Sequence, residues 1–289
     1  MKYGGIGLVM LAAILWGITG GIAEILMNKG WNPTVISFYR GAIGLICIFS
    51  WFLFRAKQNW PSSSSVYVWS TLAGVGLAGN FTFYFLSIEA SSIAIAATLM
   101  YTAPVFVLLI SFLLRLERST WLKWGCIVVI LLGTFLLTGV YKSGSSSVNL
   151  LGAATGLGSG FSYALFIFSF KNASTFGKPQ SILTIAFFAF SLILLLFIDH
   201  HEALSVITSG DVGWFLLLGL VGAGVSFVFY IVGIKWTTPS TASMIAMIEP
   251  VTASLFGVLV LKDSLTIVQL VGMLIILATI TILSVRQSN

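Results

Sequence analysis

Long runs of apolar residues, separated by short polar connections, dominate this sequence. Each run is close to the roughly 20 residues that an α-helix needs to cross the hydrocarbon core of a bilayer. The runs are continuous and do not alternate between apolar and polar residues, as the strands of a membrane barrel would. They cover residues 4–27, 34–54, 66–88, 93–114, 122–141, 150–170, 180–198, 212–234, 240–261 and 266–285. The pattern predicts an all-α integral membrane protein with ten transmembrane helices.

The composition supports this fold class. Charged residues make up 8% of the chain and hydrophobic residues 58%, whereas an average soluble domain is about 25% charged. The net charge of +6 does not indicate nucleic-acid binding, because in a membrane protein the placement of Lys and Arg matters more than their sum.

The placement of the basic residues predicts the orientation of the chain. With the N-terminus in the cytoplasm, ten Lys and Arg residues fall in cytoplasmic segments and three in outer loops. The cytoplasmic residues are Lys2, Arg55, Lys57, Arg115, Arg118, Lys123, Lys171, Lys178, Lys235 and Arg286, and the outer ones are Lys29, Lys142 and Lys262. This positive-inside bias predicts a multi-pass protein of the cytoplasmic (inner) membrane with both termini in the cytoplasm.

The two halves of the sequence resemble each other. A Ser- and Gly-rich linker at 143–149 separates a first unit, 1–142, from a second, 150–289. A shift of 146 residues pairs Gly76 with Gly222, Phe81 with Phe227, Phe83 with Phe229, Tyr84 with Tyr230, Ala96 with Ala242, Pro104 with Pro250, and Glu117 with Asp263. Because each unit has five helices, an odd number, the copies must have opposite orientations. The chain is therefore predicted to form two inverted five-helix repeats, an arrangement that places substrates near the midplane in many secondary transporters.

A carboxylate and a proline stand side by side in the middle of the ninth run. Glu249 at that depth costs roughly 2.5–3.5 kcal/mol on insertion scales unless it is paired, protonated or hydrated. Pro250 removes a backbone N–H and clashes with the carbonyl of Ala246. Pro104 occupies the matched place in the fourth run. We expect Pro104 and Pro250 to break their helices and to act as gates beside a functional cavity.

Several short motifs occur in the order and spacing of a known family. They are Leu15-Trp16-Gly17, Phe38-Tyr39-Arg40-Gly41, the stretch 84–92, Pro104, Leu116-Glu117, Tyr230, Glu249-Pro250, and Asp263 followed by Gln269 and Gly272. In this respect the chain resembles the drug/metabolite transporter superfamily, in its ten-helix EamA-type branch. The resemblance implies a central cavity lined mainly by helices 1, 3, 4, 6, 8 and 9. It also implies transport of small metabolites, often the export of amino acids.

Glu249 is the first candidate for a functional side chain. Burial in a cavity of low polarity favours the protonated form of a carboxyl group, so Glu249 could exchange a proton during transport. It could instead pair with the ammonium group of a substrate. The alternative is a permanently protonated side chain that only fixes helix packing.

Arg40 and Glu24 form the second candidate group. Their predicted depths match across the first helical hairpin, which favours a buried ion pair, since charges inside membranes generally pair with each other. The functional alternative is that Arg40 binds a substrate carboxylate through both ends of its guanidinium.

Aromatic residues form the third group, and each lies within a run predicted to face the cavity. Such rings can stack on a substrate or hold a cation over their face, although helix packing explains an aromatic residue equally well. With one polar residue added, the predicted substrate-binding set is Trp16, Asn80, Tyr84, Tyr101, Tyr163, Tyr230 and Glu249.

Other patterns are set aside. The stretch Gly74-x-Gly76-x-x-Gly79 fits a dinucleotide fingerprint but lies inside an apolar run, so we interpret it as small-residue helix packing. His200, His201 and Glu202 stand on a short loop without a spaced third ligand, and we expect a solvated turn rather than a metal site. No metal, cofactor or catalytic residue is predicted, and no nucleotide-binding Walker sequence occurs.

The combined interpretation is a secondary transporter, not an enzyme, that moves a small metabolite across the membrane by alternating access. An amino acid or a related compound is the expected substrate and export the expected direction, with possible coupling to protons at Glu249. Two alternatives remain: an importer of an organic cation, or a flippase for a lipid-linked substrate. The expected partners are the substrate and the lipid bilayer, and no protein partner is implied.

Overall fold

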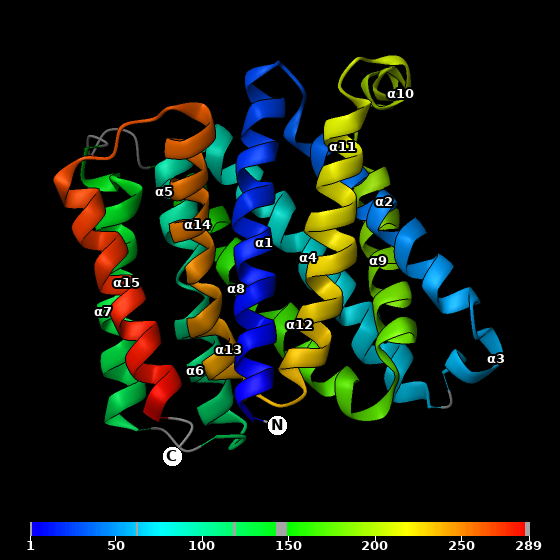
Figure 1. The fold of residues 1–289 in the computed structure, drawn as a ribbon, viewed down its shortest axis with the longest axis horizontal. Helices are drawn as coiled ribbons and strands as arrows, with labels where there is room; N and C mark the ends of the chain where they lie inside the picture. The colour runs from blue at the N-terminus through cyan, green and yellow to red at the C-terminus, as the bar shows by residue number, and fades with distance from the viewer. Residues whose placement is uncertain (1, 62, 118–119, 143–148, 287–289) are drawn as a thin grey trace.

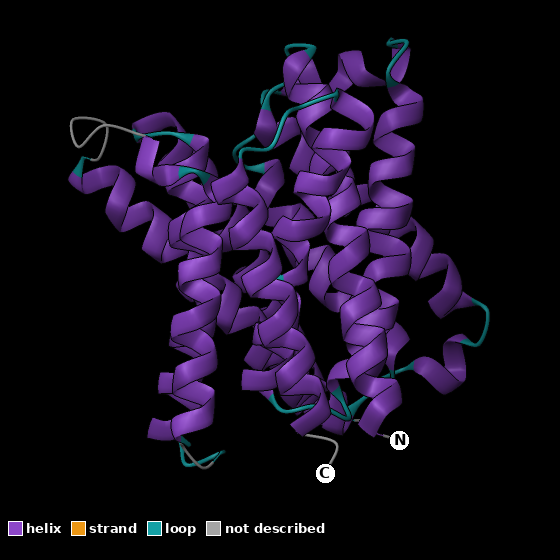
Figure 2. Ribbon diagram, turned by 60° about the vertical axis from the view of Figure 1, so that its left-hand side comes forward, coloured by secondary structure: helices purple, strands orange, loops and turns teal. Residues whose placement is uncertain are grey.

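The computed structural model of the chain describes residues 2–61, 63–117, 120–142 and 149–286. These residues form a bundle of helices and contain no strand (Figure 2). The beginning of α1 (Lys2–Asn28) and the end of α15 (Ile267–Arg286) lie at the same end of the bundle (Figure 1). We call this the proximal end and the opposite one the distal end. The linker predicted at 143–149 falls largely outside the described residues.

The helices follow one another in two sets. The first set continues with α2 (Pro33–Leu53), α3 (Ala56–Asn59), α4 (Ser64–Ala90), α5 (Ile93–Met100), α6 (Ala103–Leu113), α7 (Trp121–Thr138) and the short 3-10 helix η1 (Val140–Lys142). The second set is α8 (Leu150–Phe176), α9 (Pro179–Leu195), α10 (His200–Thr208), α11 (Val212–Gly219), the π-helix η3 (Leu220–Val225), α12 (Ser226–Ile234), α13 (Pro239–Ala246), α14 (Ile248–Phe256), the π-helix η4 (Gly257–Leu261) and α15.

The helices agree with the predicted membrane spans. Within the described part of the chain, nine helical segments are long and apolar enough to cross a membrane, and α9 with α10, bent by 115° relative to each other, makes a tenth. Three of the other nine are also compound: α5 with α6, α11 with η3 and α12, and α13 with α14 and η4. The all-α membrane fold is thus confirmed, with nine spans in the described residues, or ten when α9 and α10 are counted as one span.

The stretch 199–202, predicted as a solvated turn, instead begins a helix. Helix α9 ends at Leu195, three residues before the predicted end of its span, and α10 follows at a steep angle. The Asp199 carboxylate accepts hydrogen bonds from the amides of His201 and Glu202, at 2.9 and 3.1 Å, and so satisfies two of the unpaired N–H groups at the helix start. The prediction overlooked Asp199 as a capping residue.

The two sets run in opposite directions, as predicted for an inverted repeat. Helix α1 starts at the proximal end, whereas α8 starts at the distal end, where the hydroxyl of Ser87, near the end of α4, donates to the carbonyl of Gly152 at 2.8 Å. Equivalent helices pack in pairs: α2 contacts α9, and α7 contacts α15 at one edge of the bundle (Figure 1). The first helix of each set packs on the third span of the other, α1 on α12 and α8 on α4.

Both prolines predicted to interrupt their spans stand just after a helix break. Helix α5 ends at Met100, and α6 begins one residue before Pro104. In the other half, α13 ends at Ala246, and α14 begins two residues before Pro250. The breaks follow from the missing proline N–H, which leaves the carbonyl four residues earlier without its helical partner.

Small residues allow the closest helix contacts. A Cβ atom on Gly76 would lie 2.7 Å from the backbone nitrogen of Phe166, a separation that real Cβ atoms do not adopt. Helix α4 can therefore approach α8 this closely only because position 76 has no side chain. This explains the glycine pattern at 74–79 as helix packing rather than nucleotide binding.

Candidate functional site

A cavity of about 730 Å³ lies between the two sets of helices. Its deep part is lined by residues from the middle of spans, such as Trp16, Tyr163 and Glu249. Its mouth is lined by residues at the distal ends of helices, such as Glu24 and Asp263. The cavity therefore opens at the distal end and reaches inward to the middle of the spans.

Glu249 lies at the wall of this cavity. It is half-buried, near the midpoint of the 23-residue span Pro239–Leu261, and in the first turn of α14. One of its oxygens, Oε2, accepts a hydrogen bond from the Tyr163 hydroxyl at 3.3 Å. The break before α14 holds this carboxylate at the start of a helix, where the helix dipole favours negative charge.

A glycine on α1 brings the neighbouring helix to Glu249. A Cβ on Gly17 would lie 2.5 Å from the carbonyl oxygen of Glu249 and 2.6 Å from the Cβ of Thr252. The contact of α1 with α14 thus depends on Gly17, and it places Trp16 and Glu249 in the wall of the same cavity.

Arg40 does not form the ion pair with Glu24 that matched depths suggested. Its Nε and Nη2 donate to the carbonyl of Gly222, at 3.2 and 3.0 Å, and the guanidinium lies 5.4 Å from the centre of the Phe81 ring. Gly222 belongs to the π-helix η3, and the wider turns of such segments leave carbonyls available to outside donors. Depth along a helix, on which the predicted pair was based, does not determine the direction that a side chain takes around the helix.

The carboxylate that interacts with Arg40 electrostatically is Glu249 rather than Glu24. Both side chains line the cavity, one from each half of the chain. The deep part of the cavity thus combines one carboxylate and one guanidinium. Glu24 is exposed at the mouth instead, where its electrostatic neighbour is Asp263.

Aromatic side chains form much of the deep wall. The indole Nε1 of Trp16 donates to the Ser226 hydroxyl at 3.0 Å, and its ring centre lies 4.9 Å from that of Phe227. Tyr84, Tyr101 and Tyr163 also line the cavity. The ring of Trp16 is therefore held in place on one side and faces the cavity on the other.

Two residues of the predicted substrate-binding set occupy other positions. Tyr230 is fully buried behind Trp16, with ring centres 5.0 Å apart, and does not line the cavity. Asn80 borders the cavity, but its Nδ2 donates to the carbonyl and hydroxyl of Ser159, at 3.1 and 3.0 Å. Its amide therefore joins α4 to α8. Both residues pack helices together in this conformation.

The two prolines differ in their relation to the cavity. Pro250 lines it directly, next to Glu249, whereas Pro104 is buried outside its wall. The break before Pro104 nevertheless reaches the cavity through Tyr101, the last residue before α6 that lines it. Helix breaks from both halves thus adjoin the same space.

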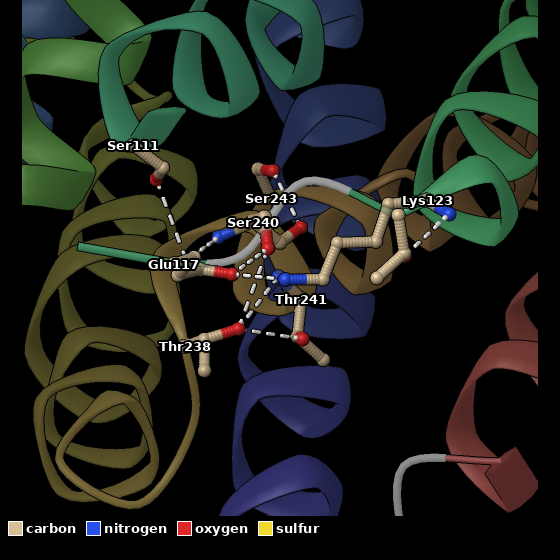
Figure 3. A network of polar contacts seen from close by, with 8 residues as sticks. Ser111, Glu117, Lys123, Thr238, Ser240, Thr241 and Ser243 are labelled. Atoms are coloured by element: carbon tan, nitrogen blue, oxygen red, sulfur yellow. Dashed lines mark hydrogen bonds and ion pairs between the residues drawn. The ribbon is translucent and has the colours of Figure 1, made fainter. Parts of the chain in front are cut away.

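A polar cluster around Glu117, which stands between α6 and α7, lies at the proximal end of the bundle (Figure 3), and its residues do not line the cavity. Its carboxylate accepts hydrogen bonds from the amide of Ser240 at 3.1 Å and from the hydroxyl of the same residue, and it pairs with the Lys123 ammonium at 2.5 Å. Ser111 adds a weaker hydroxyl contact at 3.4 Å. The cluster ties the first half of the chain to the start of α13.

The Glu117 carboxyl is held in its charged form. Burial alone would raise its pKa, since its side chain is only 6% exposed, but hydrogen bonds from Lys123 and Ser240 outweigh burial and lower the pKa below its ordinary value. A carboxylate at this position also satisfies the start of an eight-residue helix, α13, whose first amides have no helical partner.

Sequence reasoning did not assign Glu117 and Asp263 to the site, although it paired them through the shift of 146 residues. The sequence signal for these two residues was an acidic residue at matched positions just after the fourth and the ninth span. Gln269, which lines the cavity at the start of α15, also went unassigned.

Comparison with known proteins identifies the family. The EamA-like transporter family matches the chain twice, over residues 3–139 and 150–285. The chain belongs to this family. The two matched regions fall on the two sets of helices described above. Membership of this family defines the protein as a multi-pass membrane transporter whose substrate is a small molecule.

Individual relatives span almost the whole chain. An uncharacterised transporter of Archaeoglobus fulgidus is 28% identical over 289 residues, which cover 98% of this chain and 96% of that protein. The threonine/homoserine exporter RhtA of Escherichia coli is 25% identical over 284 residues, covering 94% and 88%. A solved crystal structure matches with a TM-score of 0.74 at 19% identity over 98% of this chain and 99% of the other, which shows a shared fold.

Proposed function

We propose that this protein is a secondary transporter that exports a zwitterionic metabolite, an amino acid or a close relative, across the cytoplasmic membrane by alternating access. The observation that carries the proposal is the joint presence of Arg40 and Glu249 in the wall of one cavity. A guanidinium suits a carboxylate group, and a carboxylate suits an ammonium group. The name of the RhtA relative, a threonine/homoserine exporter, supports the same substrate class and direction.

The distribution of basic residues supports an orientation for the bundle. Lys123, Lys171 and Lys235 lie toward the proximal end, as does Arg55, and the positive-inside rule assigns such an end to the cytoplasm. With both termini in the cytoplasm, the cavity opens to the outside, and the Glu117 cluster closes the cytoplasmic side. This conformation is the outward-open state of a transport cycle.

The two repeat units, 1–142 and 150–289, are the bodies that rock against each other around the cavity. Pro104 and Pro250 weaken the middle of the fourth and ninth spans, so that the half-helices on either side can tilt separately. As these half-helices tilt, one end of the cavity opens while the other closes.

Glu249 has two possible roles within this cycle. It holds the substrate ammonium group, or it takes up and releases the proton that drives transport. The two roles predict different transport activities for Glu249→Gln. A coupling residue is needed only for uphill transport, whereas a binding residue is needed for every kind of exchange.

Counterflow in proteoliposomes tests the function directly. Vesicles that contain the purified protein are loaded with an unlabelled amino acid and diluted into its radiolabelled form, beginning with threonine and homoserine and then the other common amino acids. We expect label to accumulate for at least one of them. Glu249→Gln and Arg40→Lys should each reduce that exchange by roughly tenfold or more, since the first removes a charged acceptor and the second removes the paired donors of the guanidinium.

The matched control is Glu89→Gln, which removes a carboxylate that is exposed at the end of α4 and does not line the cavity. Its exchange rate should equal that of the wild-type protein. Exchange of no amino acid above empty vesicles would contradict the proposed substrate class. Retention of exchange by Glu249→Gln together with loss of accumulation under a proton gradient would assign Glu249 to coupling.

A second candidate function, the import of an organic cation, has one observation in its favour. Three carboxylates line the cavity, those of Glu24, Glu249 and Asp263, against the one guanidinium of Arg40. A cation would need no guanidinium, so counterflow of a labelled amine that survives Arg40→Gln would favour this function over amino-acid export.

A further inference from the structure

The two ends of the bundle carry residues that correspond to each other in the repeat. The proximal end is closed, whereas the cavity opens at the distal end. At the proximal end Glu117 contacts the start of α13 (Figure 3). The shift of 146 residues pairs Glu117 with Asp263 and Ser240 with Ala94. Asp263 and Ala94 both line the cavity near its distal mouth.

The starts of α5 and α13 have the same hydrogen-bond pattern. The Ser92 hydroxyl accepts from the amide of Ile95 at 3.3 Å, and its carbonyl accepts from Ala96 at 2.9 Å. Thr238 accepts in the same way from the matched residues, Thr241 at 3.4 Å and Ala242 at 2.9 Å.

One amide distinguishes the two helix starts. In α13 the amide of Ser240 donates to Glu117, at 3.1 Å. In α5 the matched amide is that of Ala94, and no acceptor for it is found within the described part of the chain. The start of α5 thus has the donor that a carboxylate would need, and it faces the open cavity.

The surroundings of the two carboxylates also match. The Thr120 hydroxyl accepts from the amide of Lys123 at 3.3 Å, and Thr266 accepts from that of Gln269 at 3.4 Å. The difference lies in exposure: the side chain of Glu117 is 6% exposed, whereas Asp263 is exposed at the mouth.

We propose that Asp263 is the distal gate residue of this transporter. When the distal end closes, the Asp263 carboxylate accepts the amide hydrogen of Ala94 at the start of α5, as Glu117 now accepts that of Ser240. This inference rests on the alternating access proposed above. It gives Asp263 a role separate from the substrate contacts proposed for Arg40 and Glu249.

The distal gate has fewer donors than the proximal one. Lys123, which pairs with Glu117, is replaced by Gln269, and the Ser240 hydroxyl is replaced by the methyl group of Ala94. The closed distal end therefore gains one amide contact where the closed proximal end gains an amide, a hydroxyl and an ammonium contact. This imbalance favours the distal-open conformation as the resting state.

Thiol labelling of the full-length protein in nanodiscs tests the gate without any substrate. The reporters are placed at matched positions. Ala97→Cys lies at a residue that lines the cavity, and Ser243→Cys at a fully buried residue of the proximal cluster, whose hydroxyl donates to the carbonyl of Ser240. Cys47 and Cys126 are first replaced by Ala, so that a water-soluble maleimide reacts only at the reporter.

The variant Ala94→Ser/Gln269→Lys gives the distal gate the donors of the proximal one. We expect it to slow labelling of Ala97→Cys and to speed labelling of Ser243→Cys, each by roughly tenfold, the scale of added hydrogen bonds to a charged group. Adding Asp263→Asn should restore the original rates. The single change Gln269→Lys gives a smaller shift in the same sense and serves where the double variant folds poorly.

Asp211→Asn is the control for charge at the distal end, because Asp211 pairs with Lys29 away from the cavity. Added to the same double variant, it should leave the shifted rates unchanged. Unaltered labelling of Ala94→Ser/Gln269→Lys, or a shift that persists after Asp263→Asn, would overturn the assignment. Either result can occur whether or not the protein exchanges amino acids, so it does not depend on the counterflow test.

Discussion

The proximal and distal ends of this bundle are built from corresponding residues but are in different states. At the proximal end, Glu117 is almost wholly buried and joins α13 to the loop before α7. At the distal end, Asp263 is exposed beside a cavity of about 730 Å³. Because the halves are inverted copies, the closed end indicates how the open end can close. A single conformation thus shows how an end looks when it is open and when it is closed.

The largest effect is expected from breaking the closed end. Glu117→Gln removes the negative charge that both Lys123 and the Ser240 amide contact. The largely buried ammonium group of Lys123 then lacks its charged partner. We expect the free energy of unfolding to fall by ~1.5–3 kcal/mol, the range for hydrogen bonds to charged groups. Thermal unfolding followed by tryptophan fluorescence in detergent measures this. Glu89→Gln should shift unfolding by less than about 0.5 kcal/mol, and equal shifts in the two variants would contradict the cluster's role.

The matched change at the open end should leave stability nearly unaltered. The Asp263 carboxylate is exposed in this conformation, so Asp263→Asn should change the free energy of unfolding by less than about 0.5 kcal/mol. Its effect should instead appear in transport, where a weakened distal closure slows turnover several-fold, as measured by counterflow. A loss of stability as large as that of Glu117→Gln would mean that the two ends do not differ as described.

Acid should also weaken the proximal closure, though more modestly. Hydrogen bonds to Lys123 and Ser240 lower the pKa of Glu117 in spite of its burial. A lowered pKa stabilises the closed state fully above the ordinary value, and this contribution is lost as the pH falls through the lowered one. We expect the ratio of Ser243→Cys labelling rates, Glu117→Gln over wild type, to be large at neutral pH and to approach one as the pH falls through the lowered pKa of Glu117. A ratio independent of pH would contradict this.

The fold was accessible from sequence because the bilayer leaves few alternatives. Apolar runs of spanning length must become helices in lipid, since each backbone group needs an internal partner. The matched prolines indicated where two spans break. The bend between α9 and α10 was not predicted, because a capping residue such as Asp199 acts through local hydrogen bonds that hydropathy does not register.

The site was less accessible, because it depends on directions around helices. Depth placed Arg40 near Glu24, but the guanidinium reaches a carbonyl of a π-helix in the other half. The repeat paired Tyr84 with Tyr230, yet only Tyr84 lines the cavity. Inverted copies have the same backbone fold, whereas their side chains face different neighbours in any one conformation. A one-sided opening is by nature asymmetric, and a repeat in sequence cannot specify which copy is open.

The most direct test of rocking halves is a pair of distances measured in one preparation by spin-label spectroscopy. One pair of labels, at Asn28 and Ser264, spans the distal mouth, and the other, at Trp121 and Trp236, spans the proximal end. On Glu117→Gln we expect the proximal distance to lengthen and the distal distance to shorten in the same fraction of molecules. A proximal distance that lengthens while the distal one stays fixed or also lengthens would contradict the alternating closure of the two ends.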